Sequence, residues 1–358
     1  MIIPVALDGR SYPIHVVDGD LTGLGAAVAA ALPTGPVMVV TNPVVGAHYL
    51  APTMDSLSRA GFQPRAFEIP DGERHKTVAT WGDLVEALLG AGLRRTTPVV
   101  ALGGGVTGDI VGFAAASALR GVPLVQVPTT LLSMVDSAVG GKTGVNASHG
   151  KNLVGAFYQP RLVYAAMHTL GTLDPAELRS GLGEVLKHGV LLDPELFDLC
   201  EGSGDRALAL DGAVLGEMVQ RSCRVKAQVV AADEREDGLR AILNLGHTAG
   251  HAVETAAGHG TLRHGECVAL GLIAEARWCA ARGDCAASVV TRIEDAVAAL
   301  GLPTRTPPLP AQALLRAAGY DKKAARGMLR TAVIERIGAV RLETVSLDEL
   351  PRMLHLLP

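Results

Sequence analysis

The sequence predicts two domains of different class, an α/β domain over residues 1–174 and a mostly α-helical domain over residues 175–358. The first observation is length, because 358 residues exceed the roughly 100–200 residues of one ordinary domain. The second is a run of alternating strand and helix patterns in the first half of the chain. The third is a change of texture after about residue 174, where long helical patterns lack β-branched runs between them.

Five short apolar runs, each bounded by turn residues, are the predicted strands of the first domain. They are Val37–Val40, Ala66–Ile69, Val99–Leu102, Leu124–Val127 and Leu162–Ala165. Between the runs, Trp81–Leu93 repeats apolar residues at three- and four-residue steps, and Ile110–Leu119 is also helix-like. Strands that alternate with helices in this way predict a mainly parallel sheet covered by helices.

The second domain is predicted from long periodic segments, notably Ala213–Val230 and Cys267–Arg282. The segment Leu302–Pro310 contains four prolines and is expected to be a loop, since proline cannot continue a helix. We place the domain boundary near residues 170–175. A cleft between two such domains is a favoured ligand site.

Composition excludes several classes of protein. A net charge of −4 argues against general binding to nucleic acid or to an anionic membrane, and 3% aromatic residues argue against a base-stacking platform. The most apolar region, Thr97–Pro128, contains Asp109 and Arg120 and is therefore not a membrane span. Five cysteines without a CxxC pair, and no secretory leader, predict a reduced cytoplasmic protein.

A glycine-rich turn follows the third predicted strand. Gly103, Gly105 and Gly108 match G-x-G-x-x-G between a strand and a helix, where backbone N–H groups and the helix dipole can bind a phosphate. The acidic residue that an ordinary dinucleotide site needs about 20 positions later is missing, because no acid lies between Asp109 and Asp136. Two interpretations stay open: a tight packing turn, or a phosphate site that is not a standard Rossmann site.

Two lysines lie in a glycine-rich stretch, residues 140–155, that contains no acid. Lys142 and Lys151, with the amide of Asn152, are candidates to surround a phosphate. A lysine taken singly is usually a solvated surface residue. The absence of a neighbouring acid in the sequence favours the phosphate interpretation here.

Four of the eleven histidines, His247, His251, His259 and His264, lie close together in the sequence. The first two are four residues apart, so a helix would direct both to one side. Neutral imidazoles with a carboxylate are ligands that Zn²⁺ prefers, and an upstream predicted helix offers Glu184. Spacing leaves open which histidines bind an ion, and an open catalytic site needs only three protein ligands.

Taken together, these motifs resemble the 3-dehydroquinate synthase family, in register from about Val5 to beyond Lys323. The resemblance is carried by Asp71-Gly72-Glu73…Lys76, Gly103–Asp109, Pro128–Leu132, Asp136, Gly140–Asn146, Gly150–Asn152, Gly155–Phe157, Gly181…Glu184…Lys187, Asn244…His251 and Arg263–Glu266. It implies a lyase that depends on NAD⁺ and a metal, usually Zn²⁺ with Co²⁺ as a substitute, and usually a homodimer. The implied reaction converts 3-deoxy-D-arabino-heptulosonate 7-phosphate to 3-dehydroquinate and phosphate by transient oxidation, β-elimination, reduction and intramolecular aldol closure.

The resemblance also implies roles for individual residues. The metal ligands would be Glu184, His247 and His264, and the catalytic residues Lys142, Lys187, Asp136, Asn244 and His251, the last facing the substrate. The substrate's anionic groups would be bound by Arg120 (a candidate to reach from a second subunit), Lys151, Asn152, Lys226, Arg240 and Lys322 or its neighbour Lys323. The dinucleotide would lie against Asp71, Gly72, Glu73, Arg74, His75, Lys76, Gly105, Val106, Thr107, Gly108, Asp109, Thr129, Thr130, Lys142, Lys151, Thr169, Leu170, Gly171 and Thr172.

The chain departs from the family pattern at two positions. Ala176 lies in a segment where the family commonly has an arginine, so we expect a changed contact in the interdomain linker. Gly183 replaces a common alanine before Glu184, which is expected to add backbone freedom at some cost in helix propensity.

Three other functions compete with this interpretation. Another sugar-phosphate cyclase, of the aminodehydroquinate or 2-epi-5-epi-valiolone type, is the nearest. The retained Lys142, Asn152, Asn244 and His251 favour the dehydroquinate substrate over that of the valiolone type, and the aminated analogue stays open. A metal-dependent alcohol dehydrogenase would need fewer phosphate-binding cations and would release NADH. A catalytically inactive binding protein would be expected to lack a metal ligand or Lys187, and the chain has all of them.

Overall fold

The computed structural model describes residues 1–258, 260–319 and 327–358. The predicted site residues Lys322 and Lys323, and His259 of the histidine cluster, lie outside the described residues. The chain forms two compact units: Met1–Leu173 with Lys226–Ala231, and Asp174–Val225 with Ala232–Pro358.

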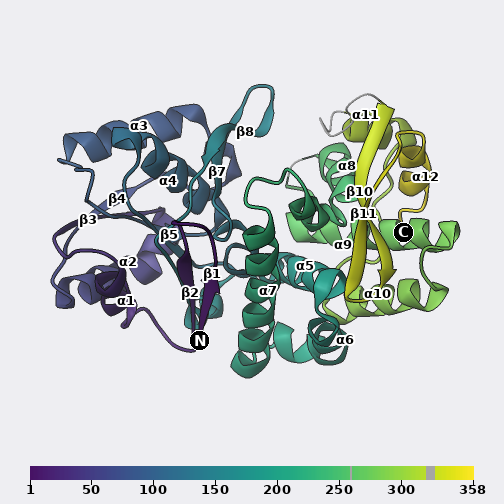
Figure 1. Cartoon of the computed structure of the whole chain (residues 1–358), viewed down its shortest axis with the longest axis horizontal. Helices are drawn as coiled ribbons and strands as arrows, with labels where there is room; N and C mark the ends of the chain where they lie inside the picture. Colours follow the sequence, from purple (N-terminus) through teal and green to yellow (C-terminus); the bar gives the residue numbers. More distant parts are fainter. Residues whose placement is uncertain (259, 320–326) are drawn as a thin grey trace. The chain divides into compact units, whose positions relative to one another are not determined.

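The first unit is built on a seven-stranded sheet with the order β1-β2-β9-β6-β5-β3-β4 (Figure 1). Its strands are β1 (Ile2–Val5), β2 (Tyr12–Val17), β3 (Pro36–Thr41), β4 (Gln63–Glu68), β5 (Val99–Gly103), β6 (Leu124–Pro128) and β9 (Leu162–Ala166). Only the β1–β2 pair is antiparallel, and the other pairs are parallel. The prediction of a mainly parallel sheet is confirmed, with β1 and β2 added at one edge.

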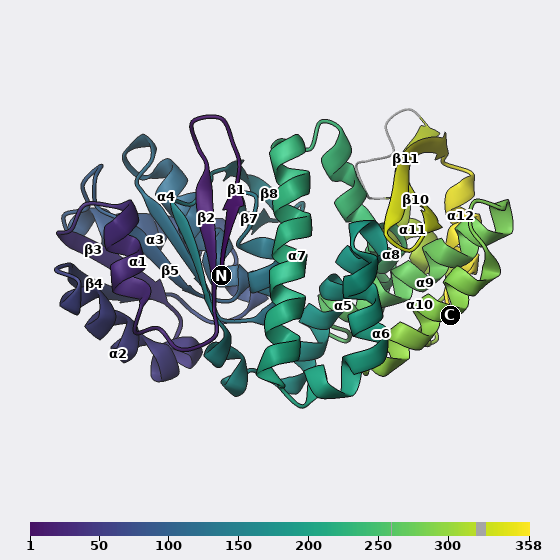
Figure 2. The same ribbon diagram turned by 60° about the horizontal axis from the view of Figure 1, so that its bottom comes forward.

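Helices cover both faces of this sheet (Figure 2). α1 (Leu24–Ala31) and α2 (Pro43–Arg59) pack on the face that contains Val37 and Val39, whereas α3 (Val78–Gly90) and α4 (Gly105–Ser117) pack on the face that contains Met38 and Val40. Successive side chains of a strand point to opposite faces, so a strand buried on both faces has a continuous apolar run. That is why four of the five runs could be recognised in the sequence, whereas the fifth belongs to β4, an edge strand that is mostly exposed.

The glycine-rich stretch between residues 140 and 155 forms an antiparallel hairpin, for which no strand was predicted. Its strands are β7 (Lys142–Ala147) and β8 (Gly150–Phe157). A Cβ on Gly155 would lie 2.1 Å from the Thr143 carbonyl oxygen, so this glycine lets the two strands approach closely. Short helical turns connect the remaining elements of the unit: η1 (Glu73–His75), η2 (Ala118–Arg120), η3 (Ser133–Ser137) and η4 (Met167–Thr172).

The second unit is mostly helical, as predicted. Its helices are α5 (Pro175–Leu192), α6 (Pro194–Leu208), α7 (Gly212–Ala232, whose last residues belong mainly to the first unit), α8 (His247–Ala257), α9 (His264–Arg282), α10 (Ala287–Ala299), α11 (Ala311–Gly319) and α12 (Glu349–His355), with the turn η5 (Leu239–Asn244). α5 and α9 are buried along most of their length. Within the described ranges, no helix combines the length and the apolar character that crossing a membrane requires.

One element of the second unit has no counterpart in the sequence prediction. The strands β10 (Met328–Arg336) and β11 (Ala339–Ser346) form an antiparallel hairpin. In β10, Leu329 and Thr331 are buried while Met328 and Arg330 are exposed, which is the two-residue period of a half-buried strand. The second unit therefore combines helices with one hairpin.

Candidate functional site

The predicted nucleotide residues of the first unit gather at one edge of the sheet. Asp71–Lys76 follow β4, Gly105–Asp109 follow β5, Thr129 and Thr130 follow β6, and Thr169–Thr172 follow β9. Since these strands are parallel, their carboxyl ends lie at the same edge. In open α/β sheets this edge is where ligands bind.

The glycine-rich turn has a packing reason for its glycines. A Cβ on Gly104 would lie 3.0 Å from Thr130 Cγ2, and one on Gly108 would lie 2.9 Å from Gln126 Oε1. Gln126 Nε2 also donates to the Gly108 carbonyl oxygen at 3.1 Å. α4 begins at Gly105, earlier than predicted, and its first turn is partly exposed. The packing interpretation thus accounts for the small residues, and the N–H groups of an accessible helix start still suit a phosphate.

Asn42 is a residue of this edge that the sequence reasoning missed. It follows β3, is 5% exposed, and caps α2 by accepting the Val45 N–H at 2.9 Å. Its Nδ2 donates to Thr107 Oγ1, at 3.4 Å, in the first turn of α4. An asparagine before a proline at the end of an apolar run is a helix N-cap signal that could have identified it.

A buried lysine joins a predicted nucleotide residue to a predicted substrate residue. Lys76 is 5% exposed, and its Nζ contacts Asp109 Oδ2 at 2.5 Å and Asn152 Oδ1 at 2.6 Å. Burial raises the pKa of Asp109 above its ordinary value, although the neighbouring Lys76 charge opposes the increase.

Other predicted residues are distributed around this unit. In the paired register of the hairpin, Lys142 lies at the open end and Lys151 near the turn, roughly 13 Å apart along the strands at about 3.3 Å per residue. Arg120 is exposed and has a left-handed backbone conformation with φ of 64°. Lys226, in the stretch of α7 that belongs to this unit, forms an ion pair with Asp136.

Three predicted metal ligands converge in the second unit. Glu184 lies in α5, and His247 and His264 are the first residues of α8 and α9. Glu184 Oε1 lies 3.5 Å from His247 Nε2 and 3.3 Å from His264 Nε2. One carboxylate oxygen and two imidazole nitrogens within 4.8 Å of one another form a donor set that suits Zn²⁺.

The buried carboxylate at the centre of this trio fits a cation. Glu184 is fully buried, and neither of its oxygens accepts a hydrogen bond of ordinary geometry from the described residues. Lys187, on the next turn of α5, forms an ion pair with Glu184 Oε2. Burial alone would raise the pKa of Glu184, but Lys187, His264 and His247 outweigh it and hold the pKa well below its ordinary range. The carboxylate is therefore charged.

The two histidines differ in their electrostatics. Burial and the Lys187 charge lower the pKa of His247 well below its ordinary value, so its imidazole is neutral and can donate a lone pair. Burial also opposes charge on His264, but the neighbouring carboxylates of Glu184 and Glu254 outweigh it and raise its pKa to about 9.

Each histidine is oriented by a polar group that contacts its Nδ1 atom. His247 Nδ1 lies 3.1 Å from the Leu245 carbonyl oxygen, and His264 Nδ1 lies 3.4 Å from Glu254 Oε2. Such contacts fix the ring and leave Nε2 for a metal. Glu254 was not predicted. His251, Glu254 and His264 form a second candidate group of donors, so His264 is shared by both.

The turn that precedes His247 is fixed by another carboxylate that was not predicted. Gly246 has φ of 76°, and its N–H donates to Glu275 Oε2 at 2.8 Å. Glu275 is fully buried in α9. Glu275 in α9 thus helps to determine where α8 begins and so positions the backbone of His247, its first residue.

Close packing of α5 on α9 corrects the expectation for Gly183. A Cβ on Gly183 would lie 2.3 Å from the Gly265 carbonyl oxygen, and one on Gly265 would lie 1.8 Å from the Ser180 carbonyl oxygen. Ser180 Oγ also accepts the Gly265 N–H at 3.0 Å. Gly183 therefore serves a close approach of two backbones, and this approach brings Glu184 and His264 together.

We expect the substitution Gly265→Ala to destabilise the protein by about 1–3 kcal/mol, because the added methyl group must push α9 away from α5. Zn²⁺ affinity should fall as well, since His264 precedes Gly265. Chemical denaturation with chelator and zinc titration of the metal-free protein measure the two effects. The control is Gly216→Ala in α7, where nothing lies within 4 Å of the added Cβ and a gain of up to about 1 kcal/mol is expected. Equal stability of the two variants would contradict the packing argument.

Two further predicted residues, Arg240 and Asn244, lie in η5 and depend on the loop before it. Asp233 Oδ2 accepts the N–H of Gly238 at 2.8 Å and of Arg240 at 2.9 Å. Asn244 Nδ2 donates to Glu236 Oε1 at 2.7 Å. Arg240 is 2% exposed, so the loop fixes a buried guanidinium.

The unpredicted β10–β11 hairpin supports this loop. Arg330 of β10 donates to the carbonyl oxygens of Asp237 at 3.2 Å and Gly238 at 2.7 Å.

The start of α5 is the segment that lacks the arginine expected from the resemblance. There, Asp174 caps α5 by accepting the Ala176 N–H at 2.7 Å. Glu177 of the same helix forms an ion pair with Arg263 at 3.2 Å.

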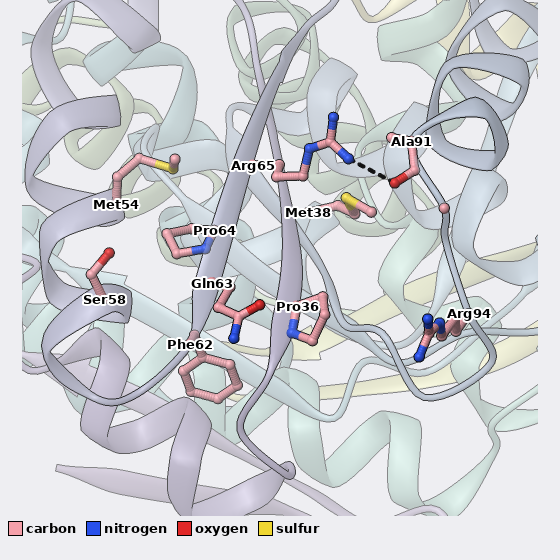
Figure 3. A pocket seen from close by; sticks show the side chains of 11 residues that line it. Pro36, Met38, Met54, Ser58, Phe62, Gln63, Pro64, Arg65, Ala91 and Arg94 are labelled. Atoms are coloured by element: carbon pink, nitrogen blue, oxygen red, sulfur yellow. Dashed lines mark hydrogen bonds between the residues drawn. The ribbon is translucent and has the colours of Figure 1, made fainter.

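A cavity of about 570 Å³ lies at the opposite edge of the sheet, by the first residues of β3 and β4 (Figure 3). Its lining includes Met38, Phe62, Arg65 and Arg94, and Arg65 donates to the Ala91 carbonyl oxygen at 2.8 Å. None of the predicted site residues that the structure describes lines this cavity.

Comparison with known proteins gives the same assignment for both units. Residues 66–180 match the family model of the N-terminal domain of 3-dehydroquinate synthase, and residues 181–324 match that of its C-terminal domain. A 3-dehydroquinate synthase from Geobacter metallireducens is 48% identical over 347 residues, which cover 96% of each chain. The chain belongs to the 3-dehydroquinate synthase family.

Solved structures of related cyclases share the fold of this family member. A 2-epi-5-epi-valiolone synthase from Streptomyces hygroscopicus, with NAD⁺ and Zn²⁺ bound, matches with a TM-score of 0.88 at 30% identity and covers 98% of each chain. A 2-deoxy-scyllo-inosose synthase complexed with carbaglucose-6-phosphate, NAD⁺ and Co²⁺ matches with a TM-score of 0.87 at 25% identity and covers 99% of each chain. The two-domain architecture predicted from the sequence is confirmed.

Proposed function

We propose that this member of the 3-dehydroquinate synthase family converts 3-deoxy-D-arabino-heptulosonate 7-phosphate to 3-dehydroquinate and phosphate. The observation that carries the proposal is the trio of Glu184, His247 and His264, whose donor atoms converge in a family member that is 48% identical to a named synthase. The proposed sequence of events is transient oxidation, β-elimination of phosphate, reduction and intramolecular aldol closure.

The residues present fit both cofactors. The trio would hold Zn²⁺, with Co²⁺ as a substitute, and the residues at the carboxyl edge of the first unit's sheet would hold NAD⁺. The metal would supply polarisation of a substrate hydroxyl, and the NAD⁺/NADH couple would supply reversible hydride transfer. Because the hydride is returned, no NADH accumulates.

The chain's own residues bind the substrate and move its protons. Lys187 lies beside the metal ligand Glu184, and Asn244 is held by Glu236, so both can orient a hydroxyl group. We assign His251 and Asp136 to the reacting hydroxyls as well. The cations that bind the phosphate and carboxylate groups are Arg120, Lys142, Lys151, Lys226 and Arg240, assisted by the Asn152 amide.

The substrate assignment has one close competitor. Enzymes for an aminated analogue or for sedoheptulose 7-phosphate belong to the same superfamily, and a 2-epi-5-epi-valiolone synthase is 30% identical to this chain. The higher identity to 3-dehydroquinate synthases, 48%, supports the dehydroquinate substrate.

A substrate panel tests the function. Purified protein with NAD⁺ and Zn²⁺ should release one phosphate per 3-deoxy-D-arabino-heptulosonate 7-phosphate consumed, without net NADH. Phosphate is measured by a coupled colour assay and NADH by its absorbance. Stoichiometric NADH would indicate an alcohol dehydrogenase, and phosphate release from sedoheptulose 7-phosphate alone would indicate the other cyclase.

We further propose a homodimer in the cytoplasm, as the family resemblance implies. Leu153 and Phe157 of β8 are 42% and 45% exposed, and such apolar side chains favour burial against a partner. We assign no role to nucleic acid or to a membrane.

A further inference from the structure

Asn146, near the end of β7, lies between residues proposed for the nucleotide and a residue proposed for the substrate. We propose that Asn146 is a positioning residue whose side-chain amide couples Glu73, on the nucleotide side, to Asn152, on the substrate side. This inference rests on the proposed function, because it takes the roles of Glu73 and Asn152 from it.

The side chain of Asn146 forms hydrogen bonds with both Glu73 and Asn152. Its Nδ2 donates to Glu73 Oε1 at 2.8 Å, and its Oδ1 accepts the backbone N–H of Asn152 at 2.8 Å. Its own backbone N–H donates to the Lys76 carbonyl oxygen at 2.8 Å, and it forms a parallel bridge with Thr77. One side chain thus connects η1 to β8 while the backbone fixes its position.

The chemistry of the amide explains why the residue is an asparagine. A carboxamide donates and accepts at the same time, and each function is used here by a different partner. An aspartate of equal size would keep the acceptor for Asn152 but would face the Glu73 carboxylate with a second negative charge. The contact to Glu73 therefore distinguishes asparagine from aspartate.

Asn152 depends on this support because of its backbone. Its φ of 56° is left-handed, a conformation that few residues other than glycine adopt and that asparagine tolerates. The hydrogen bond from its N–H to Asn146 holds this conformation, and Lys76 Nζ donates to its Oδ1 at 2.6 Å. With Oδ1 facing Lys76, the Nδ2 group is the end of the side chain that can donate to a phosphate or carboxylate oxygen.

Glu73 is oriented by the same amide. Its Oε1 accepts from Asn146, which directs the carboxylate, and a carboxylate is what a dinucleotide site uses for ribose hydroxyls. Loss of the Asn146 amide should therefore weaken nucleotide and substrate together. A residue that only held the hairpin in place would affect stability without a dependence on the Glu73 side chain.

The test is a double-mutant cycle with Asn146→Asp and Glu73→Gln in the full chain loaded with Zn²⁺. Asn146→Asp should raise the Kd for NADH, measured by fluorescence titration, and the KM for substrate by about tenfold each, with kcat changed less. Adding Glu73→Gln restores the contact with its polarity reversed, because glutamine donates to the new carboxylate. The double variant should therefore bind NADH about as well as Glu73→Gln alone.

Ser148→Ala, in the hairpin turn, is the matched control and should change neither constant by more than about twofold, because the exposed Ser148 hydroxyl lies 3.1 Å from Nδ1 of its neighbour His149 and so acts within the turn itself. Failure of Glu73→Gln to rescue Asn146→Asp, or an unchanged Kd for NADH in Asn146→Asp, would overturn the inference. If the wild-type protein released no phosphate, the proposed function would fail. The double-mutant cycle, measured by the Kd for NADH, would still test the coupling between Asn146 and Glu73.

Discussion

Zinc should be lost, and phosphate release should fall by on the order of 10³-fold or more, when Glu184 is replaced by glutamine. Glutamine keeps the shape of the side chain in its buried position but removes the charge that two histidine Nε2 atoms face at 3.3 and 3.5 Å. The substitution also leaves Lys187 buried without its carboxylate partner, so its positive charge next to the place of the ion is no longer compensated. Metal content after dialysis and a phosphate assay measure the two losses.

The matched control for this variant is Glu217→Gln in α7. Glu217 is 55% exposed and pairs with Arg221 at 3.1 Å, so its loss should change stability by less than about 1 kcal/mol and leave the metal content unchanged. A Glu184→Gln protein that kept one Zn²⁺ per chain would contradict the ligand assignment. Circular dichroism of both variants separates loss of the metal from loss of the fold.

The sheet and the main helices could be predicted because their signals are local. A strand buried on both faces is a continuous apolar run, as in β3 and β5, and α9 repeats its apolar residues over many turns. The β10–β11 hairpin could have been recognised by the alternation in β10, but its flanking sequence is helix-like. In residues 140–155 the sequence analysis assigned no strand, because the glycines permit a close strand pairing that only the partner strand reveals.

The proposed metal ligands Glu184, His247 and His264 could be named from a resemblance, but not from spacing alone. Spacing left four histidines as candidates, and Glu184 lies far upstream in the chain. The groups that orient the ligands were missed for a physical reason. Glu254, Glu275 and Glu236 act through contacts, at 3.4, 2.8 and 2.7 Å, with residues that only the folded loops and helices bring near them. The local sequence around a glutamate in a helix or loop does not distinguish a side chain that orients a site residue from one that is simply exposed to solvent.

The substitution Lys187→Met should separate metal binding from activity, which Glu184→Gln loses together. The Lys187→Met protein should keep its Zn²⁺ while phosphate release falls by about 10²–10⁴-fold. In the wild-type protein, the ammonium group of Lys187 pairs with Glu184, and a bound divalent ion must share that carboxylate with it. Methionine fills a similar volume without charge, so the repulsion between lysine and metal is removed and Zn²⁺ should bind at least as tightly. Chemistry should suffer because Lys187 is proposed to act on a reacting hydroxyl. Zinc titration and a phosphate assay measure the two.

Stability provides a second measurement on the same variant. Without the metal, Lys187→Met removes the lysine partner of the fully buried Glu184 carboxylate and leaves His264 as the cation beside it, and breaking such a buried pair costs up to about 3–5 kcal/mol. Binding of Zn²⁺ supplies the missing positive charge, so saturating zinc should raise the Tm more in the variant than in the wild-type protein. Arg221→Met, which removes ion pairs with Asp193, Glu195 and Glu217 in the same unit, should show the wild-type response to zinc. If Lys187→Met lost zinc together with activity, Lys187 would be a support for the metal site rather than a group that acts on the substrate.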